Sequence, residues 1–413
     1  MSRVIVIGGG AAGMMAAVAA AETGHEVVLL EKNEKLGKKI YITGKGRCNL
    51  TNACDRDAFF RNIVSNPKFL YSAYYHMDQE AVMNLMEEEG CPVKTERGDR
   101  VFPVSDHASD VIRALHNRMD RMGVSVSLHT AVKEICVRDG AVTGVLTGQK
   151  KFLNADAVVL AAGGRSYPTT GSDGDGYRLA RSLGHTITEI RPALVPLCIR
   201  ETWCRELQGL ALKNIGIRIT GERDGREIFR DFGEMLFTHF GISGPVVLSA
   251  SSYLACADRQ DTYTVHLDLK PALSMEQLDK RLLHDFAGNQ NRQFKNTLNG
   301  LFPVRMIPVM IHLSGISPEK KINEISREER RIFAERVKDV RMTITGTRGF
   351  DEAIVTQGGV STGEINPSTM ESKLVRNLFF AGEIMDVDAL TGGFNLQIAW
   401  STGHLAGEKI PWL

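Results

Sequence analysis

The sequence predicts an α/β protein whose main domain is built from both ends of the chain and is interrupted by an inserted β-plus-helical module. Residues 3–31 have the pattern of a strand, a glycine-rich turn, a helix and a second strand. The pattern changes near residue 191 to short alternating segments, and a strand of the buried type returns at 377–381. A chain of 413 residues is long enough for two or three domains of roughly 150 residues each.

The composition is that of a globular protein with balanced charge. Hydrophobic residues make up 43% and charged residues 24%, and 50 Lys and Arg face 49 Asp and Glu. This balance gives no whole-molecule attraction to nucleic acid or to acidic lipid. No apolar run reaches the roughly 18 residues that a membrane span needs, so we expect a cytoplasmic protein.

The seven cysteines are scattered over the chain and form no Cys-x-x-Cys pair. An odd number of scattered cysteines is typical of thiols in a reducing compartment. It predicts neither a disulfide framework nor a zinc site, and we expect no bound metal.

The first 31 residues form a complete βαβ unit. Arg3–Ile7 is a short run rich in β-branched residues, as in a buried parallel strand. Ala11–Thr23 is rich in small residues and ends at Gly24, which predicts a helix and its stop. His25–Leu30 is a second buried strand, and parallel pairing of the two strands requires the helix between them.

The chain up to residue 190 continues this domain. A loop dense in Gly, Lys and Asn covers residues 36–52, and helical patterns follow to about Glu89. A helix is expected from Gly174 to Leu183. Four further segments predict strands: Val124–Leu128, Ala131–Val137, Ala141–Leu146 and Ala157–Leu160.

Residues 191–273 are expected to form an inserted β domain and residues 274–338 a helical one. The alternating segments of the β insert are Leu212–Thr220, Arg226–Phe229 and Thr262–Leu269. Residues 339–413 then return to the β insert and complete the domain formed by residues 1–190.

Gly8, Gly10 and Gly13 fit the pattern G-x-G-x-x-G between a strand and a helix. In this context the first glycine permits a tight turn, the second lets a pyrophosphate approach the backbone, and the third lets the helix lie close to the sheet. Glu31 ends the second strand, where a carboxylate accepts hydrogen bonds from ribose hydroxyls and repels a 2′-phosphate. The unit therefore predicts a site for FAD or NAD rather than NADP.

Three later segments favour FAD over NAD. Val158–Gly164 is a buried strand that ends in small residues, and Leu378–Glu383 is a strand that ends in Gly-Glu. Thr391–Gln397 opens a helix whose positive end could face the pyrimidine part of a flavin. An NAD dehydrogenase would not need this C-terminal half, so the sequence predicts a two-part FAD site.

Five blocks resemble the signatures of the BaiN/RdsA family of NAD(P)/FAD-dependent oxidoreductases, in that family's order along the chain. The blocks are Thr43–Asn52, Tyr167–Gly176, Leu236–Pro245, Val355–Val360 and Ala381–Asp388. The resemblance implies a three-layer, discontinuous, Rossmann-like FAD domain of the glutathione-reductase type, with an inserted β-barrel and helical module. Members of the family include a reductase of 3-dehydro bile acids and a reductase of uridine in ribosomal RNA, and relatives have been described as amine oxidases.

The resemblance also implies which residues bind FAD. The ADP half would contact Gly8, Gly10, Ala12, Gly13, Glu31 and Lys32, with Val132, Ala162 and Gly163 near adenine. The stretch from pyrophosphate to flavin would contact Gly44, Arg47, Cys48 and Asn49. The ribityl chain and ring would contact Gly382, Glu383, Gly393, Phe394, Asn395 and Leu396.

No second G-x-G-x-x-G follows a strand, so NAD(P)H would act as a transient electron donor at the flavin face. The candidates for proton transfer are His239, Cys48 and Tyr167. Cys48 would be activated if Arg47 lowered the pKa of its thiol. His239 precedes the helix start Gly244-Pro245 and could protonate a substrate carbon or polarise a carbonyl.

Together, the motifs and the resemblance predict a reductase in which FAD transfers hydride from N5 to a C=C bond conjugated to a carbonyl. The nearly neutral charge favours a small hydrophobic substrate, such as a 3-dehydro bile acid or a steroid enone. The alternatives are the reduction of uridine to dihydrouridine in ribosomal RNA and the oxidation of a small amine of the aminoacetone type.

Overall fold

The computed structural model describes residues 2–258 and 260–412. The chain divides into two compact units, which we describe separately. Unit 1 consists of Met1–Ala193 with Gly349–Leu413, and unit 2 consists of Leu194–Arg348. The first unit is therefore discontinuous in sequence, with the second unit inserted into it.

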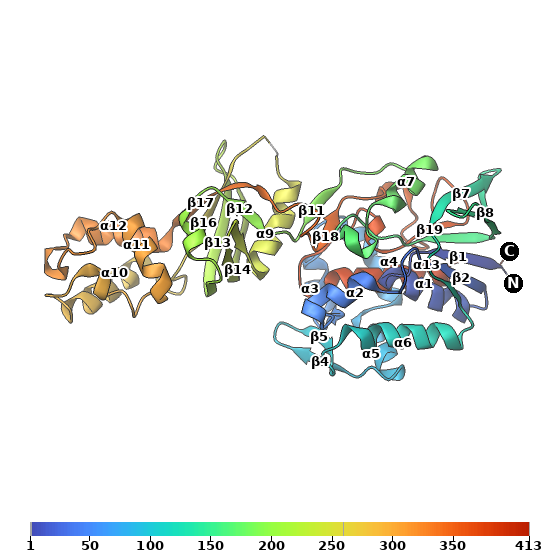
Figure 1. Ribbon diagram of the computed structural model, residues 1–413, viewed down its shortest axis with the longest axis horizontal. Helices are drawn as coiled ribbons and strands as arrows, with labels where there is room; N and C mark the ends of the chain where they lie inside the picture. Colours follow the sequence, from blue (N-terminus) through green and yellow to red (C-terminus); the bar gives the residue numbers. More distant parts are fainter. Residues whose placement is uncertain (1, 259, 413) are drawn as a thin grey trace. The chain divides into compact units, whose positions relative to one another are not determined.

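A five-stranded parallel sheet forms the centre of unit 1 (Figure 1). Its order is β19-β10-β1-β2-β6, so that a strand from the C-terminal part completes the edge of a sheet begun at the N-terminus. The predicted βαβ unit and the return strand are confirmed. The strands are β1 (Arg3–Ile7), β2 (Glu26–Leu30), β6 (Ser125–Ser127), β10 (Ala157–Leu160) and β19 (Leu378–Phe380).

Two helices from opposite ends of the chain pack together in unit 1, α1 (Ala11–Glu22) and α13 (Phe394–Glu408). Helix α1 is rich in alanine and almost wholly buried, because α13 lies against it. Figure 1 shows both helices on one side of the sheet and the β7–β8–β9 meander on the other, which gives three layers. The remaining helices are α2 (Lys38–Ile42), α3 (Arg56–Arg61), α4 (Tyr71–His76), α5 (Gln79–Glu88), α6 (Ala108–Arg121) and α7 (Asp175–Ser182).

Smaller sheets surround this core. Strands β7 and β8 of the meander lie within one residue of their predicted bounds, whereas β9 and the hairpin of β4 and β5 were not predicted because these strands are short. These strands are β3 (Thr51–Asn52), β4 (Val93–Glu96), β5 (Arg100–Pro103), β7 (Val132–Arg138), β8 (Ala141–Thr147), β9 (Phe152–Asn154), β11 (Arg191–Ala193) and β18 (Val355–Gln357).

Unit 2 contains a closed six-stranded barrel of order β12-β15-β14-β13-β16-β17. The predicted strand Arg226–Phe229 is wrong in length, because β14 continues to Thr238 with exposed polar residues such as Asp231 and Glu234. The barrel strands are β12 (Leu197–Ile199), β13 (Ala211–Gly221), β14 (Glu227–Thr238), β15 (Gly241–Ser243), β16 (Tyr263–Asp268) and β17 (Val340–Thr347).

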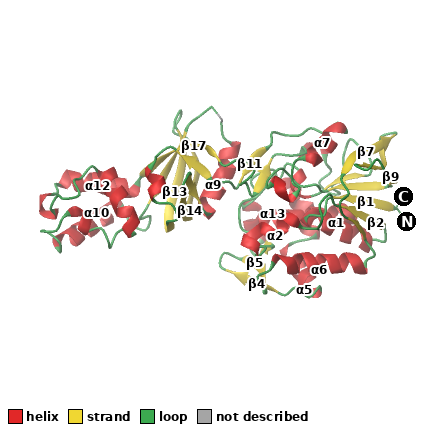
Figure 2. Cartoon of the chain, viewed as in Figure 1, coloured by secondary structure: helices red, strands yellow, loops and turns green. Residues whose placement is uncertain are grey.

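A helical module lies between β16 and β17 in the sequence (Figure 2). Capping boxes start two of its helices, at Ser274 with Gln277 and at Ser326 with Glu329. Among the described residues, no helix combines the length and apolar character that crossing a bilayer would require. The helices of unit 2 are α8 (Trp203–Glu206), α9 (Pro245–Cys256), α10 (Met275–Ala287), α11 (Ile307–Ser314) and α12 (Arg327–Lys338).

Candidate FAD site in unit 1

The glycines of the first turn meet different requirements. Gly8 has φ +107°, and a Cβ there would lie 2.5 Å from the Ala161 carbonyl oxygen. A Cβ at Gly13 would lie 1.8 Å from the Gly8 carbonyl oxygen, so the turn and the helix need both glycines. Gly10 has an ordinary φ of −82°, and a Cβ there would meet nothing within 4 Å. The packing of the protein itself therefore does not require glycine at position 10. A ligand that approaches the start of α1 would require it.

Glu31 ends β2 beside this turn and is buried. Its Oε2 accepts a hydrogen bond from the Gly9 N–H at 2.7 Å, and its Oε1 accepts two from Asn33 at 2.8 and 2.7 Å. The Glu31 carboxylate therefore lies beside the glycine-rich turn, as the sequence predicts. Lys32 forms ion pairs with Asp173 at 2.7 Å and Asp175 at 3.2 Å, in the segment that leads into α7.

The connection between β6 and β7 is hydrogen-bonded to the segment that contains Glu31. The Thr130 N–H donates to the Glu31 carbonyl at 2.9 Å, and the His129 N–H donates to the Asn33 carbonyl at 3.1 Å. Val132 begins β7 two residues later. The predicted contact of the Val132 backbone with adenine remains a prediction.

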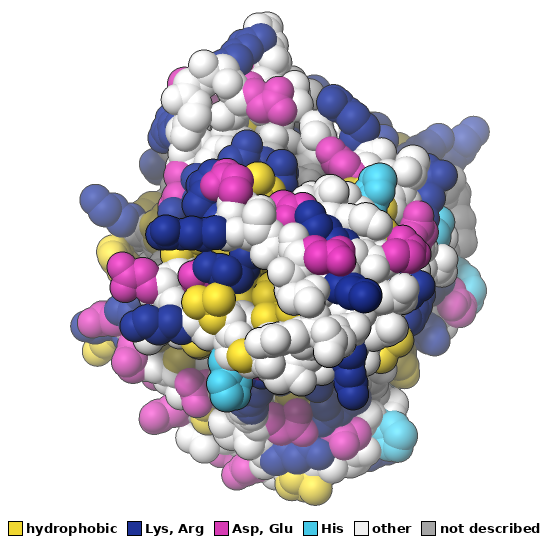
Figure 3. Space-filling view, turned by 90° about the vertical axis from the view of Figure 1, so that its left-hand side faces the viewer, with side chains coloured by type: hydrophobic (Ala, Val, Ile, Leu, Met, Phe, Trp, Pro, Cys, Tyr) yellow, Lys and Arg dark blue, Asp and Glu magenta, His cyan; other side chains and the backbone are white. Residues whose placement is uncertain are grey.

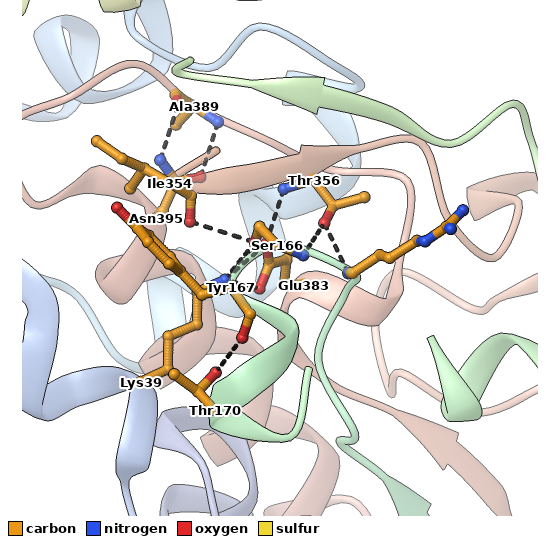
Figure 4. Close-up of polar contacts among 10 residues, drawn as sticks. Lys39, Ser166, Tyr167, Thr170, Ile354, Thr356, Glu383, Ala389 and Asn395 are labelled. Atoms are coloured by element: carbon orange, nitrogen blue, oxygen red, sulfur yellow. Dashed lines mark hydrogen bonds and ion pairs between the residues drawn. The ribbon is translucent and has the colours of Figure 1, made fainter. Parts of the chain in front are cut away.

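Glu383 is the centre of a polar network at the carboxyl end of β19 (Figure 4). Lys39 Nζ, on α2, lies 2.7 Å from Oε2 and 3.0 Å from Oε1 of Glu383. The Thr356 N–H and the Ser166 hydroxyl donate to Oε1 at 2.8 and 2.9 Å. Burial opposes the charge of Glu383, but Lys39 and these donors lower the pKa of the carboxyl below its ordinary value. The group is thus held as a carboxylate.

Residues 162 and 163 lie at the carboxyl end of β10, next to this network. Ala162 and Gly163 are half-buried, and Gly163 has φ +72°. A Cβ at Gly163 would lie 3.9 Å from Glu383 Oε2. Two of the predicted FAD contacts are therefore neighbours, although 220 positions separate them in the sequence.

Gly393 starts helix α13 with φ +102°, and a Cβ there would lie 2.3 Å from the Thr51 carbonyl oxygen. Figure 4 shows Asn395 against Ala389: Asn395 Oδ1 accepts from the Ala389 N–H, and Nδ2 donates to its carbonyl. These bonds close the loop before the helix. Phe394 is buried and Leu396 half-buried in the first turn.

The loop from Thr43 to Asn49 has left-handed backbone at Gly44, with φ +57°. A Cβ at Gly44 would lie 2.9 Å from the Asn49 backbone nitrogen, so the loop needs glycine there. Arg47 is paired with Glu96 of β4 and with Asp106, whose Oδ1 accepts from Arg47 Nε at 2.9 Å. These hydrogen bonds raise the pKa of Arg47.

The structure corrects the predicted activation of Cys48. The thiol is completely buried, and burial raises the pKa of Cys48 to about 12. Arg47 does not lower it, because the guanidinium is engaged by Glu96 and Asp106. A thiol buried in this way is poorly ionised at neutral pH, and the predicted contact of Cys48 with FAD remains a prediction.

The other two candidates for proton transfer belong to different units of the chain. Tyr167 belongs to unit 1, where its N–H donates to the Phe350 carbonyl at 3.1 Å and burial raises the pKa of its hydroxyl. His239 belongs to unit 2, at the exposed turn between β14 and β15, with Phe240 at 4.9 Å between ring centroids. Their catalytic roles remain predictions.

The arrangement of unit 1 fits FAD. Helices α1 and α13 both begin at a glycine with no side-chain cap and no acidic residue in the first turn, so the N–H groups of both helix ends remain for an external acceptor. Gly10 leaves room at the start of α1, and Glu383 follows Gly382, which packs against Ala12 in the first turn of that helix. Among residues 2–258 and 260–412, no three His, Cys, Asp or Glu side chains are grouped as a metal site would need.

Sequence reasoning did not identify Lys39, Ser166 or Thr356. Lys39 follows Lys38 in a loop with several lysines, so no local pattern distinguishes it. Ser166 immediately precedes the block Tyr167–Gly176, and Thr356 lies within the block Val355–Val360, but no local pattern assigns either residue to the FAD site. Only the tertiary structure brings these three groups to one carboxylate.

Comparison with known proteins agrees with this geometry. The family model described as HI0933-like protein Rossmann domain matches residues 2–409. A 3-dehydro-bile acid delta(4,6)-reductase of Clostridium scindens is 34% identical over 412 residues, which cover 99% of this chain and 98% of the relative. A ribosomal RNA dihydrouridine synthase of Escherichia coli is 32% identical over 408 residues, which cover 98% of this chain and 97% of the relative.

Solved structures share the fold. A 3-ketosteroid delta1-dehydrogenase from Sterolibacterium denitrificans superposes with a TM-score of 0.54 at 14% identity, covering 99% of both chains. An Escherichia coli quinol fumarate reductase gives a TM-score of 0.53 at 19% identity, covering 99% of this chain and 69% of the other. With the full-length family match and the FAD-type fold, the chain belongs to the HI0933-like Rossmann family and is a flavin-dependent oxidoreductase of the BaiN/RdsA type.

Proposed function

We propose that the protein is an FAD-dependent reductase that saturates a C=C bond conjugated to a carbonyl, with a 3-dehydro bile acid or a related steroid enone as substrate and NAD(P)H as reductant. The observation that carries this proposal is the 34% identity to a bile-acid reductase along the whole length of both chains. Bound FAD would supply the hydride, from N5 to the β-carbon of the alkene.

The residues of unit 1 would bind and orient the cofactor for this step. The N–H groups at the start of α1 would bind the pyrophosphate, and Glu383 would accept hydrogen bonds from the ribityl hydroxyls. The start of α13 would present its positive end to the pyrimidine part of the ring, where charge accumulates on reduction. These groups are fixed by the fold, so they need not reorganise during the reaction.

The proton for the α-carbon requires a separate donor, which we assign to His239. An imidazole can both give a proton to a carbon and polarise a carbonyl. We expect His239→Ala to retain FAD but to slow reoxidation of the reduced flavin by the enone. His312, an exposed histidine of α11, supplies the control variant His312→Ala. Equal reoxidation rates in the two variants and the wild type would remove His239 from the mechanism.

The alternative substrate is uridine in ribosomal RNA, which the name of the second relative supports. An RNA-binding face should carry an excess of unpaired basic side chains. Residues 274–338 contain twelve Lys or Arg and eight Asp or Glu, and ion pairs such as Arg330–Asp279 and Lys320–Glu329 use several of them. Figure 3, which faces the helical module, shows basic and acidic side chains intermixed. The module still has four more basic than acidic residues, so we prefer the small substrate on the higher identity to the bile-acid reductase rather than on charge.

An anaerobic experiment tests the assignment. The purified protein is reduced with dithionite and mixed with a 3-oxo-4,6-diene steroid or with unmodified ribosomal RNA, and the return of the oxidised flavin absorbance is followed. We expect fast reoxidation by the steroid. Fast reoxidation by RNA alone would support the dihydrouridine alternative. Bleaching of the oxidised protein by aminoacetone would instead indicate an amine oxidase.

A further inference from the structure

The two oxygens of Glu383 have unequal surroundings. Oε1 accepts from the Thr356 N–H, the Ser166 hydroxyl and Lys39, whereas among the described residues Oε2 accepts from Lys39 alone. A carboxylate oxygen can accept about two hydrogen bonds, so Oε1 is saturated and Oε2 retains capacity. The Glu383 side chain is 21% exposed, which leaves it accessible to a ligand.

The free oxygen lies on the cofactor side of the network. Oε2 is close to Gly163, where an added Cβ would come within 3.9 Å of it. Gly382, immediately before Glu383, packs against Ala12 of α1, and its N–H donates to Thr402 of α13 at 2.9 Å. Glu383 is thus held between the two helices whose N-termini are assigned to FAD.

Lys39 supplies the positive charge that this carboxylate needs. Its Nζ also donates to the Ser166 hydroxyl at 2.5 Å, so three contacts fix the ammonium group. The other titratable groups around Glu383 are Asp388 on the same loop and Tyr177 on α7, and Asp386 lies beside both of these. None of these three groups can carry positive charge, so removal of Lys39 would leave an uncompensated carboxylate.

We propose that Lys39 is a positioning residue of the FAD site: it keeps Glu383 ionised and oriented with Oε2 free to accept hydrogen bonds from the hydroxyl groups of the ribityl chain. This role rests on the binding of FAD and does not depend on the substrate. It also explains why Lys39 is held by three hydrogen bonds while its neighbour Lys38 forms only an exposed pair with Glu34 at 3.3 Å.

The test measures FAD affinity rather than turnover. FAD is titrated into the deflavinated full-length chain, and flavin fluorescence quenching is followed at about pH 6 and about pH 8. We expect Lys39→Met to weaken FAD binding by about tenfold at the higher pH, which corresponds to ~1.4 kcal/mol. The loss should be smaller at the lower pH, because protonation of Glu383 then removes the uncompensated charge.

A double-mutant cycle separates this role from simple packing. Glu383→Gln removes the charge, so Lys39→Met should cost little in the Glu383→Gln background, and the pH dependence should disappear. Lys38→Met is the matched control and should bind FAD like the wild type. Lys39→Gln replaces Lys39→Met if the latter does not melt cooperatively.

Two results would overturn the proposal: wild-type affinity in the Lys39 variant at both pH values, or fully additive losses in the double variant. A wild-type chain that binds no FAD at all would instead refute the cofactor assignment on which the proposal rests.

Discussion

Gly403 of α13 lies directly against Ala12 of α1: a Cβ at Gly403 would come within 2.3 Å of the Ala12 carbonyl oxygen. Gly407 has the same relation to Ala16, one turn later in both helices, so the two helices run in the same direction. Helix α13 begins at Phe394, and a rise of 1.5 Å per residue therefore carries its N-terminus roughly 12 Å beyond that of α1. This contact sets the spacing between the helix end assigned to the pyrophosphate and the one assigned to the flavin ring.

The first prediction concerns this contact. Gly403→Val should force the helices apart, destabilise the chain by about 1–3 kcal/mol and reduce the bound FAD. The FAD-to-protein absorbance ratio and the melting temperature measure the two effects. Gly363→Ala is the control, because a Cβ there meets only the Ser361 hydroxyl, at 3.5 Å. Undiminished FAD binding in Gly403→Val would show that the helix spacing does not matter to the cofactor.

The second prediction separates a ligand requirement from a folding requirement. Gly10→Ala adds a methyl group to open space at an ordinary φ, so the deflavinated chain should melt within about 0.5 kcal/mol of the wild type. The same methyl group occupies the place of the pyrophosphate, so the purified protein should lose most of its yellow colour. Gly13→Ala should instead destabilise the chain with or without FAD, because its Cβ would clash with the Gly8 carbonyl. Full flavin content in Gly10→Ala would contradict the placement of the pyrophosphate.

The helices and strands that are determined by local sequence patterns were predictable. β1, α1 and β2 follow from buried strands and a glycine turn, and β19 from the apolar run before Gly382. That β19 completes the sheet begun at the N-terminus was also predictable, because a two-part cofactor site requires both ends of the chain to be adjacent. The role of Gly10 was also predictable, because the spacing of the glycines in G-x-G-x-x-G has a known chemical reason.

The charge pairing of the site was not predictable. Lys39 and Glu383 are 344 residues apart, and only the tertiary structure brings α2 next to the residues that follow β19. The partners of Arg47 come from β4 and the turn after β5, and both strands have only four residues, too few to show a clear pattern. The predicted lowering of the Cys48 pKa by Arg47 was wrong for this reason, since a thiol's pKa depends on burial and on partners that sequence spacing does not reveal.

The third prediction follows from the burial of Cys48. A thiol with a pKa of about 12 has almost no thiolate at neutral pH, so iodoacetamide should not label Cys48 in the native chain. Exposed Cys256 should be labelled first. Peptide mass spectrometry measures the order of labelling, and labelling after denaturation confirms that Cys48 can be detected. Rapid labelling of native Cys48 would show that the loop opens in solution and would restore the residue as a candidate.

The last prediction concerns Asp388, which is 1% exposed. Its Oδ2 accepts from Gln357 at 3.2 Å, and its Oδ1 has no partner among the described residues. Burial, together with the negative charges of Asp386 and Glu383, raises the pKa of Asp388 to about 6. The folded chain therefore binds more protons than the unfolded chain between pH ~4 and ~6. In this window the contribution of Asp388 to the free energy of unfolding falls as pH rises.

Asp388→Asn should remove this dependence. Raising a carboxyl pKa by about two corresponds to ~3 kcal/mol. Between pH ~4 and ~7, the free energy of unfolding of the wild type should therefore fall by up to that amount relative to that of the variant. Urea unfolding of both chains across this range measures the difference, and the exposed Asp57→Asn serves as the control. A difference that stays constant with pH would mean that folding does not raise the pKa of Asp388.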